Sequence, residues 1–149
     1  MRIAIAADHG GYALKQELIP YLEEKGHSVI DCGTDSEASV DYIDYAEKGC
    51  AEYLNGNADF AILCCGTGVG ISIAANKIKG IRCGLCPSVE IARLVKQHNN
   101  ANAISLGGRT TSPELAKEII DAYMTAEFMG GRHQTRVDKI TALEEKSNS

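Results

Sequence analysis

Short apolar runs alternate along the chain with longer segments that repeat apolar residues at helical spacing. Each run predicts a strand because it spans few residues, is almost wholly apolar and is bounded by Gly, Asp or Asn. Strands of this kind suit a parallel sheet that helices cover on both faces. The predicted strands are Arg2–Ala7, Ser28–Asp31, Asp59–Cys64, Ile81–Cys86 and Asn102–Leu106.

The segments between the predicted strands have the apolar spacing of amphipathic helices. In Tyr12–Lys25, the residues Leu14, Leu18 and Leu22 repeat every four positions, and a glycine follows as a stop signal. Pro20 lies within this pattern and predicts a kink or an irregularity on the solvent side. The further predicted helices are Tyr42–Leu54, Val69–Ile78, Ser88–Gln97 and Pro113–Phe128, with Asp41 and Ser112 as candidate N-caps.

Successive strand–helix units joined by right-handed crossovers predict an α/β fold, a three-layer, doubly wound, Rossmann-like domain with a five-stranded parallel sheet. The 149 residues fit a single domain with its core in residues 1–128. Gly130 and Gly131 then break the helical pattern, which resumes in Arg132–Lys146. Since no further strand follows, we expect residues 129–149 to form a helical arm that docks on a partner subunit.

The charge balance limits the classes of ligand. The chain has 15 Lys and Arg against 20 Asp and Glu, which gives a net charge of −5. Nucleic-acid and membrane-surface binders need a concentrated positive field, so neither partner is expected, and an anionic ligand must meet a local basic cluster. No apolar run approaches the roughly 18 residues of a membrane span, and Met1 leads directly into a strand pattern without a signal peptide. We therefore expect a cytoplasmic protein.

The cysteines lie in apolar segments of a domain long enough to fold without disulfides, so free thiols in a reducing compartment are expected. Cys83 and Cys86 have the C-x-x-C spacing of redox and zinc motifs. Within a strand, however, positions three apart face opposite sides, and the second pair that structural zinc needs is missing. A thiol redox protein that uses these two cysteines stays open as an alternative. The six cysteines are at positions 32, 50, 64, 65, 83 and 86.

A glycine-rich loop, Gly66-Thr67-Gly68-Val69-Gly70, connects the third predicted strand to a helix. Such a loop lets backbone N–H groups approach an anion, and the helix N-terminus adds partial positive charge. A tight turn that merely needs small residues is the structural alternative. The loop is neither a Walker A motif, because no Gly-Lys-Ser/Thr follows, nor a dinucleotide-binding fingerprint, because its third glycine comes one position early.

Cys65 stands at the start of this loop. A thiol at a helix N-terminus tends toward the thiolate, which serves as a base or a nucleophile. By strand alternation Cys64 is predicted to point the opposite way, into the core. A cysteine-dependent phosphatase would need an arginine six residues after the cysteine, where this chain has Ile71.

Further polar residues end the predicted elements. Asp8 and His9 end the first strand, His98 follows the fourth helix, and Arg132 and Arg136 share one helical face. A fork of arginines is a common phosphate clamp, although a helix cap for the aspartate and a solvated basic face for the arginines are alternatives. Because doubly wound sheets bind ligands at the carboxyl ends of their strands, we expect the glycine loop, the thiol and the basic arm at one sheet edge.

Several motifs, spread over nearly the whole chain, are more specific in combination than any one of them. They are Asp8-His9-Gly10-Gly11, Asp41-Tyr42, Cys65-Gly66-Thr67-Gly68-Val69-Gly70-Ile71-Ser72, Gln97-His98-Asn99 and Gly130-Gly131-Arg132-His133-Gln134-Thr135-Arg136. Together they closely resemble the family of type B ribose-5-phosphate isomerases and galactose-6-phosphate isomerase subunits, from Met1 to about Leu143. Ile43 departs from the family pattern, which usually has proline there, but this change removes no functional group.

The resemblance implies an aldose–ketose isomerase that needs no metal and no cofactor. It would interconvert ribose 5-phosphate and ribulose 5-phosphate, in the pentose phosphate pathway, through a cis-enediolate. Cys65 would be the base between C1 and C2, Thr67 and the loop amides would stabilise the enediolate oxygen, and His98 of a partner subunit would open the furanose ring. The implied substrate-binding residues are Asp8, His9, Gly66, Thr67, Gly68, Val69, Gly70, Asn99, Arg109, Arg132 and Arg136.

The same resemblance implies how the phosphate is held and how the chains assemble. His9, Arg132 and Arg136 would bind the phosphate, with Arg109 nearby. The implied assembly is a homodimer with shared active sites, with a tetramer as the alternative. Two other functions stay open: isomerisation of a hexose 6-phosphate such as allose or galactose 6-phosphate, and a non-catalytic sugar-phosphate binding module.

Overall fold

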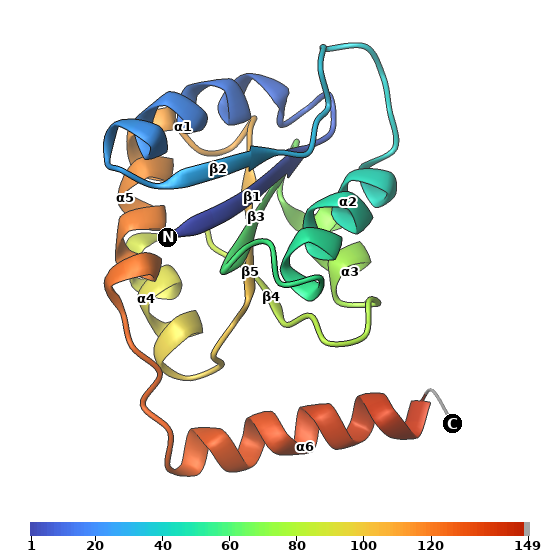
Figure 1. The fold of residues 1–149 in the computed structure, drawn as a ribbon, viewed down its shortest axis with the longest axis vertical. Helices are drawn as coiled ribbons and strands as arrows, with labels where there is room; N and C mark the ends of the chain where they lie inside the picture. Colours follow the sequence, from blue (N-terminus) through green and yellow to red (C-terminus); the bar gives the residue numbers. More distant parts are fainter. Residues whose placement is uncertain (148–149) are drawn as a thin grey trace.

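The strands form a single parallel sheet in the order β2-β1-β3-β5-β4, as the computed structural model of the chain, which describes residues 1–147, shows (Figure 1). The predicted α/β fold with a five-stranded parallel sheet is therefore confirmed. Every strand pairs in parallel with its neighbour, with registers such as Ile3 opposite Val29 and Ile62 opposite Ile104. The strands are β1 (Arg2–Ala7), β2 (Ser28–Asp31), β3 (Phe60–Cys65), β4 (Cys83–Leu85) and β5 (Ala103–Gly107).

Helices cover both faces of the sheet (Figure 1). Helices α1, α4 and α5 pack on one face, and α2 and α3 pack on the other. A further helix, α6, lies below the sheet and apart from both layers. The helices are α1 (Tyr12–Glu24), α2 (Tyr42–Leu54), α3 (Val69–Ala75), α4 (Val89–Gln97), α5 (Pro113–Thr125) and α6 (Arg132–Ser147).

The two faces of the sheet differ in side-chain size. In β1 the large residues Ile3 and Ile5 face α1, α4 and α5, whereas the small residues Ala4 and Ala6 face α2 and α3. A Cβ on Gly49 of α2 would lie 2.8 Å from the Leu63 side chain. Helix α2 therefore sits close against the sheet, which the small residues on that face permit.

Most predicted element boundaries agree with the structure, and the differences have local causes. Helix α3 ends at Ala75 rather than Ile78, and β4 is shorter than predicted. Between them the Asn76 side chain donates to the Cys83 carbonyl and accepts from the Cys83 amide, both at 2.8 Å. The amide side chain takes the place of further helical and strand hydrogen bonds at this turn.

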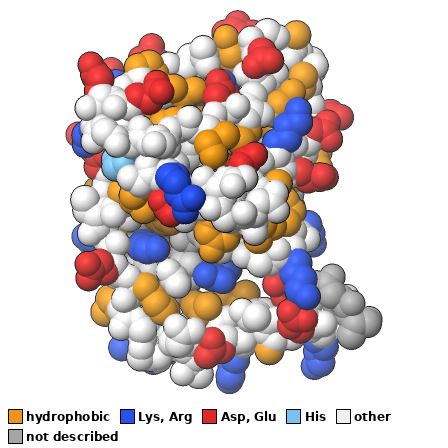
Figure 2. All heavy atoms as spheres, viewed as in Figure 1, with side chains coloured by type: hydrophobic (Ala, Val, Ile, Leu, Met, Phe, Trp, Pro, Cys, Tyr) orange, Lys and Arg blue, Asp and Glu red, His pale blue; other side chains and the backbone are white. Residues whose placement is uncertain are grey.

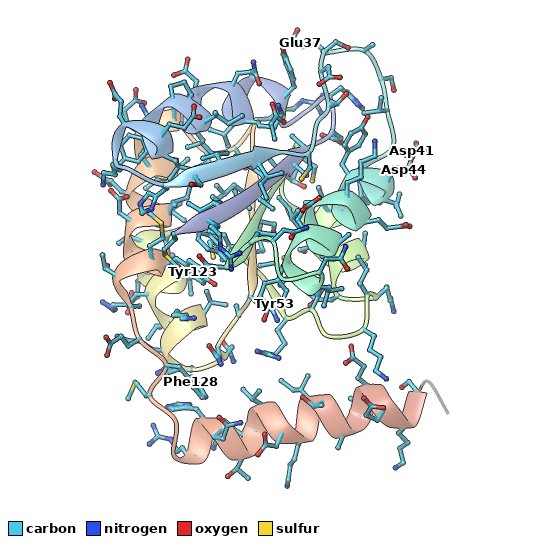
Figure 3. All side chains as sticks on the ribbon, in the orientation of Figure 1. Glu37, Asp41, Asp44, Tyr53, Tyr123 and Phe128 are labelled. Atoms are coloured by element: carbon cyan, nitrogen blue, oxygen red, sulfur yellow. The ribbon has the colours of Figure 1, made fainter. Side chains whose placement is uncertain are left out.

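Capping follows the prediction at α5 but not at α2. Ser112 accepts a hydrogen bond from the Leu115 amide at 3.2 Å, and Pro113 occupies the first turn, as predicted. Asp41 is the N-cap residue of α2, but its side chain makes no capping hydrogen bond, so that prediction is wrong; it lies at the exposed start of the helix (Figure 3). Pro20 occupies an exposed position within α1, which continues through it.

Helix α6 follows a connection that contains Phe128 (Figure 3) and two glycines in the left-handed region, Gly130 at φ 67° and Gly131 at φ 56°. Contacts between the helix and its own domain include the Lys79–Glu145 ion pair at 3.2 Å and the hydrogen bonds from the Gly80 amide to the Glu144 carboxylate at 3.1 Å. A hollow separates the helix from the rest of the domain in Figure 2, and its volume is about 720 Å³. No helix within residues 1–147 is both long and apolar enough to span a bilayer.

Candidate active site

The order of the strands reverses between β1 and β3, which are neighbours although β2 lies between them in sequence. Loops at such a switch point diverge to opposite faces of the sheet and leave a crevice at the carboxyl ends of the strands. Here the loops after β1, β3 and β5 contact one another. The Gly108 amide donates to the Cys65 carbonyl at 2.8 Å, and the Arg109 amide donates to the Gly66 carbonyl at 2.9 Å.

The glycine-rich loop has a conformation that requires glycine at its centre. Gly68 has φ 80°, and a Cβ there would lie 2.7 Å from Leu85 and 2.9 Å from the Leu106 carbonyl carbon. The buried Ser105 hydroxyl donates to the Gly68 carbonyl at 2.9 Å, which fixes this turn to β5. The loop therefore follows β3 closely, and α3 starts at the next residue.

Two loop amides donate inside the loop: Gly68 to the Cys65 sulfur and Val69 to the Thr67 hydroxyl oxygen, both at 3.2 Å. The amides of Gly66, Thr67 and Gly70 donate to no acceptor in residues 1–147. They remain free for an anion. Amide N–H groups at the start of a helix carry partial positive charge, so these three amides can donate hydrogen bonds to a negatively charged ligand.

The adjacent cysteines differ in their surroundings. Cys64 belongs to the core beneath α1, α4 and α5, and Cys65 to the opposite face, which confirms the predicted alternation. Burial raises the pKa of Cys64 to about 12, so this thiol stays neutral near pH 7. The Cys65 sulfur accepts the Gly68 amide, and such a donor stabilises a negative charge on sulfur.

The Asp8-His9 pair at the end of β1 is held by the backbone. Asp8 is buried, and its Oδ1 accepts from the Gly10 amide at 2.9 Å and the Gly11 amide at 3.1 Å, so it holds the turn before α1 and does not cap the helix, whose N-cap residue is Gly11. His9 accepts at Nδ1 from the Val40 amide at 3.1 Å. A neutral His9 therefore carries its hydrogen on Nε2, which leaves that nitrogen as a donor.

The Arg109 guanidinium lies over the glycines of two loops. A Cβ on Gly66 would lie 2.9 Å from its Nη1, and one on Gly10 would lie 3.4 Å from its Cζ. A Cβ on Gly10 would also lie 2.9 Å from the Gly66 nitrogen, so glycine at position 10 lets the two loops lie this close beneath the arginine. The arginine places a fixed positive charge beside the free amides of the loop.

Tyr42, at the start of α2, lies against the glycine-rich loop. The sequence places it in a motif but assigns it no role. A Cβ on Gly70 would lie 2.7 Å from its Cζ, so the aromatic ring covers the backbone of the loop at that point. The neighbouring Ile43, where the family usually has proline, is exposed, and α2 still begins at Tyr42. The departure from the family pattern thus leaves the helix start in place.

His98, Asn99, Arg132 and Arg136 lie at the other edge of the sheet, so the expectation that the basic arm and the thiol share one edge is wrong within a single chain. The reason is the crossover: α4 runs back from the carboxyl end of β4 to the amino end of β5, which places its last residues below the sheet (Figure 1). The Met129 amide then donates to the Gln97 carbonyl at 3.0 Å, which ties the arm to this end of α4.

At that lower edge, the ring of His98 stacks on the ring of His133, with 4.3 Å between centroids and 8° between planes. His133 is buried, and its Nε2 has no hydrogen-bond partner within residues 1–147. Desolvation, together with the neighbouring His98 ring and the charges of Arg132 and Arg136, lowers the pKa of His133. The motif spacing gave no sign of this stack, because it joins residues 35 positions apart in sequence.

The remaining cysteines pack in the core. All six are free thiols, and Cys83 and Cys86 belong to opposite faces of the sheet, as the spacing in a strand predicts. Burial raises the pKa of both, that of Cys86 to about 12. Within the part of the chain that the structure describes, no three His, Cys, Asp or Glu residues are grouped to hold a metal ion.

Comparison with known proteins gives matches that extend over nearly the whole chain. The family model described as Ribose/Galactose Isomerase matches residues 3–140. Ribose-5-phosphate isomerase B of Escherichia coli (strain K12) is 48% identical over 147 residues, which cover 99% of each protein.

Solved structures give the same result for the fold. Ribose-5-phosphate isomerase B of Clostridium thermocellum superposes with a TM-score of 0.97 at 48% identity, covering 99% of each chain. A ribose 5-phosphate isomerase of Thermotoga maritima superposes with a TM-score of 0.93 at 50% identity, covering 95% of this chain and 97% of that one.

Proposed function

Because the chain belongs to the ribose/galactose isomerase family and is a sugar-phosphate isomerase, we propose that it interconverts ribose 5-phosphate and ribulose 5-phosphate without a metal or cofactor. One observation carries the proposal: the Cys65 sulfur lies next to a loop with unpaired amides, with the Arg109 charge beside it. A base, an oxyanion site and a phosphate-attracting charge are what an aldose–ketose isomerase needs at one place.

In the proposed reaction, the Cys65 thiolate removes the proton from C2 of the open-chain aldose. The electrons of the C2–H bond form the C1–C2 double bond of a cis-enediolate, and the π electrons of the C1 carbonyl move onto O1. The C2 hydroxyl proton passes to O1, the O2 electrons form the C2 carbonyl, and the double-bond electrons take the proton back from Cys65 at C1. Between these steps, negative charge collects on the enediolate oxygens. The amides of Gly66, Thr67 and Gly70 donate to that charge, with the Thr67 hydroxyl beside them. Since the charge develops only along the reaction, these donors favour the transition state over the bound sugar.

We propose that the lower half of the site comes from a second copy of the chain. His98, Asn99, Arg132 and Arg136 lie across the sheet from their own Cys65, so a site with all these groups needs two chains. In the homodimer, His98 of the partner protonates the ring oxygen, Asn99 binds sugar hydroxyls, and the two arginines bind the phosphate together with His9. Asp8 assists at the sugar hydroxyls through its other carboxylate oxygen.

Apolar side chains next to both halves support this assembly. Val69 and Ile73, on α3 beside the glycine loop, are 44% and 57% exposed. On the arm, Ile140 and Leu143 are 47% and 64% exposed and line the hollow above α6. Apolar surfaces of this kind are covered in most oligomers, which suits a dimer in which residues 129–149 dock on the partner.

Arg136→Ala is expected to raise KM for ribose 5-phosphate about 10- to 100-fold and to change kcat about threefold or less. A charge-assisted hydrogen bond to phosphate acts on the bound sugar and the transition state alike. Steady-state kinetics of the purified variant would measure both constants. Lys139→Ala, which removes an exposed cation three residues along α6, serves as the matched control. An unchanged KM for Arg136→Ala would mean that this arginine does not bind the phosphate and belongs to a solvent-exposed basic face of α6.

The substrate is tested by comparing kcat/KM for ribose 5-phosphate with that for allose 6-phosphate and galactose 6-phosphate in one isomerase assay. Ribose 5-phosphate is expected to be preferred at least about tenfold, since an extra carbon between the reacting centre and the phosphate must be accommodated between fixed groups. A higher kcat/KM for a hexose 6-phosphate would overturn ribose 5-phosphate as the proposed substrate, while the proposed isomerase chemistry would stand.

A further inference from the structure

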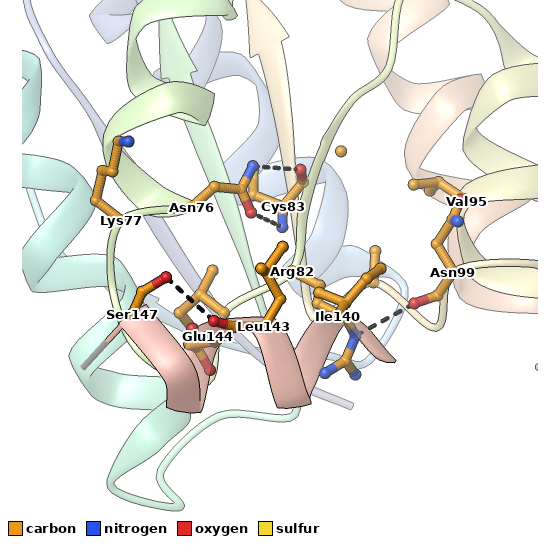
Figure 4. Close-up of a pocket in the computed structure, with 13 residues that line it drawn as sticks. Asn76, Lys77, Arg82, Cys83, Val95, Asn99, Ile140, Leu143, Glu144 and Ser147 are labelled. Carbon is orange, nitrogen blue, oxygen red and sulfur yellow. Dashed lines mark hydrogen bonds between the residues drawn. The ribbon is translucent and has the colours of Figure 1, made fainter. Parts of the chain in front are cut away.

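Arg82, between α3 and β4, makes two hydrogen bonds to the segment that follows α4. Its Nε donates to the Asn99 carbonyl at 3.2 Å, and its Nη2 donates to the Asn100 carbonyl at 2.8 Å (Figure 4 shows the bond to Asn99). These carbonyls lie just beyond His98, the C-cap residue of α4, where the backbone has left the helix. The guanidinium satisfies both of them at once.

The backbone of Arg82 is itself fixed. Its amide donates to the Asn102 side-chain oxygen at 2.8 Å, and its carbonyl accepts from the Asn102 amide at 3.0 Å. Asn102 is buried, and its side-chain nitrogen donates to the Gly80 carbonyl at 2.9 Å. The guanidinium therefore extends from a well-anchored point directly before the edge strand β4.

The segment that Arg82 holds is strained. Asn100 has φ 45°, the one non-glycine residue with positive φ in residues 1–147. A left-handed residue directly after a helix sets the direction in which the preceding side chains point. The bond from Arg82 to the Asn100 carbonyl holds this turn, and the two residues before it are His98 and Asn99.

We propose that Arg82 is a positioning residue of the isomerase: it fixes the His98–Asn99 segment in the geometry in which a partner subunit's site uses it. The inference rests on the proposed shared site and adds to it a residue that touches neither substrate nor Cys65. The His98–His133 stack holds the imidazole from one side, and Arg82 holds the backbone from the other.

The first test is the kinetics of Arg82→Met, which keeps an apolar stem and removes the donors. We expect kcat/KM for ribose 5-phosphate to fall about 10- to 100-fold, as misplacement of a reacting group does. Arg82→Lys, which retains one donor group, should recover part of the loss. Arg93→Met is the matched control, because within residues 1–147 this half-exposed arginine of α4 makes a single ion pair, with Glu90 at 3.9 Å, and its loss should leave the activity unchanged.

A second readout separates positioning from general damage. Ribulose 5-phosphate has no furanose form, because its C5 oxygen carries the phosphate, so its reaction needs no ring opening. A displaced His98 should therefore reduce kcat at saturating ribose 5-phosphate several-fold more than kcat at saturating ribulose 5-phosphate, both taken from initial rates. Equal losses of kcat in the two directions would mean that Arg82 supports the fold and not His98.

Mixed dimers locate the defect. Paired with a Cys65→Ala chain, which keeps His98 and Arg82, the Arg82→Met chain should recover activity, because its own Cys65 then meets an intact partner segment. Paired with a His98→Gln/Arg136→Ala chain, it should not recover. Recovery in the second pair would contradict the proposal.

A parallel mixture of Cys65→Ala with His98→Gln/Arg136→Ala tests the shared site by itself. If that mixture stays inactive, the shared site is wrong and the role of Arg82 falls with it. If it recovers while Arg82→Met retains the activity of the Arg93→Met control, the shared site stands and only the assignment of Arg82 is overturned.

Discussion

Cys65→Ala is expected to lower kcat for ribose 5-phosphate by about 10²- to 10⁴-fold, because it removes the group that carries the proton between C1 and C2. Binding should be nearly unchanged, since the loop amides, Arg109 and the arginines of the arm all remain. Stopped assays with high enzyme concentration would measure the residual turnover, and calorimetry would measure the affinity for ribose 5-phosphate.

The adjacent cysteine offers a control that differs by one position. Cys64→Ala removes a thiol from the core on the other face of the sheet. It should lower the free energy of unfolding by about 1 kcal/mol and leave kcat within about threefold. If Cys65→Ala retained substantial turnover while still binding the sugar phosphate, the base would have to be another group.

A mixture of two inactive variants is expected to regain activity. Cys65→Ala lacks the base, and the His98→Gln/Arg136→Ala chain lacks the donated half of the site. In a mixed dimer, one site combines both defects, and the other combines the intact Cys65 of one chain with the intact His98 and Arg136 of its partner. Each mixed dimer should therefore have one of its two sites restored, which is about one quarter of all sites in an equal, randomly paired mixture.

The experiment requires that the chains exchange partners. The two variants would carry different affinity tags, be mixed under mild denaturant and be refolded, and the dimers that retain both tags would be assayed. Each variant refolded alone is the control. Activity that stays at the level of the separate variants, in dimers shown to carry both tags, would place all the catalytic groups in one chain.

Much of the fold was predictable because the spacing of apolar residues and the length of each segment distinguish strands from helices in this chain. The all-apolar β3 and the glycines after it predicted both the strand end and the loop, and alternation alone separated Cys64 from Cys65. The Asn76 side chain, which closes the turn before β4, gave no such signal. Whether a side chain replaces backbone hydrogen bonds in this way depends on which backbone groups the fold brings next to it, and the local sequence pattern does not show that.

Candidate site residues could be named from the sequence, and they stay predictions, but their layout could not be predicted. Nothing in the order of His98 and Arg136 along the chain states that both lie across the sheet from Cys65, because that depends on the direction of α4 and on the turn at Gly130. The stack of His133 and the bonds of Arg82 join residues distant in sequence. Such contacts follow from the folded chain alone.

The proposed shared site, with its two halves at opposite ends of one sheet, has a consequence for how activity depends on concentration. A chain whose own half-sites cannot meet is expected to be inactive as a monomer. Below the dissociation constant of the proposed dimer, the number of complete sites would rise with the square of the chain concentration, so dilution would reduce the turnover per chain as well as the total. A newly synthesised chain is then expected to become active only after it pairs with a second one.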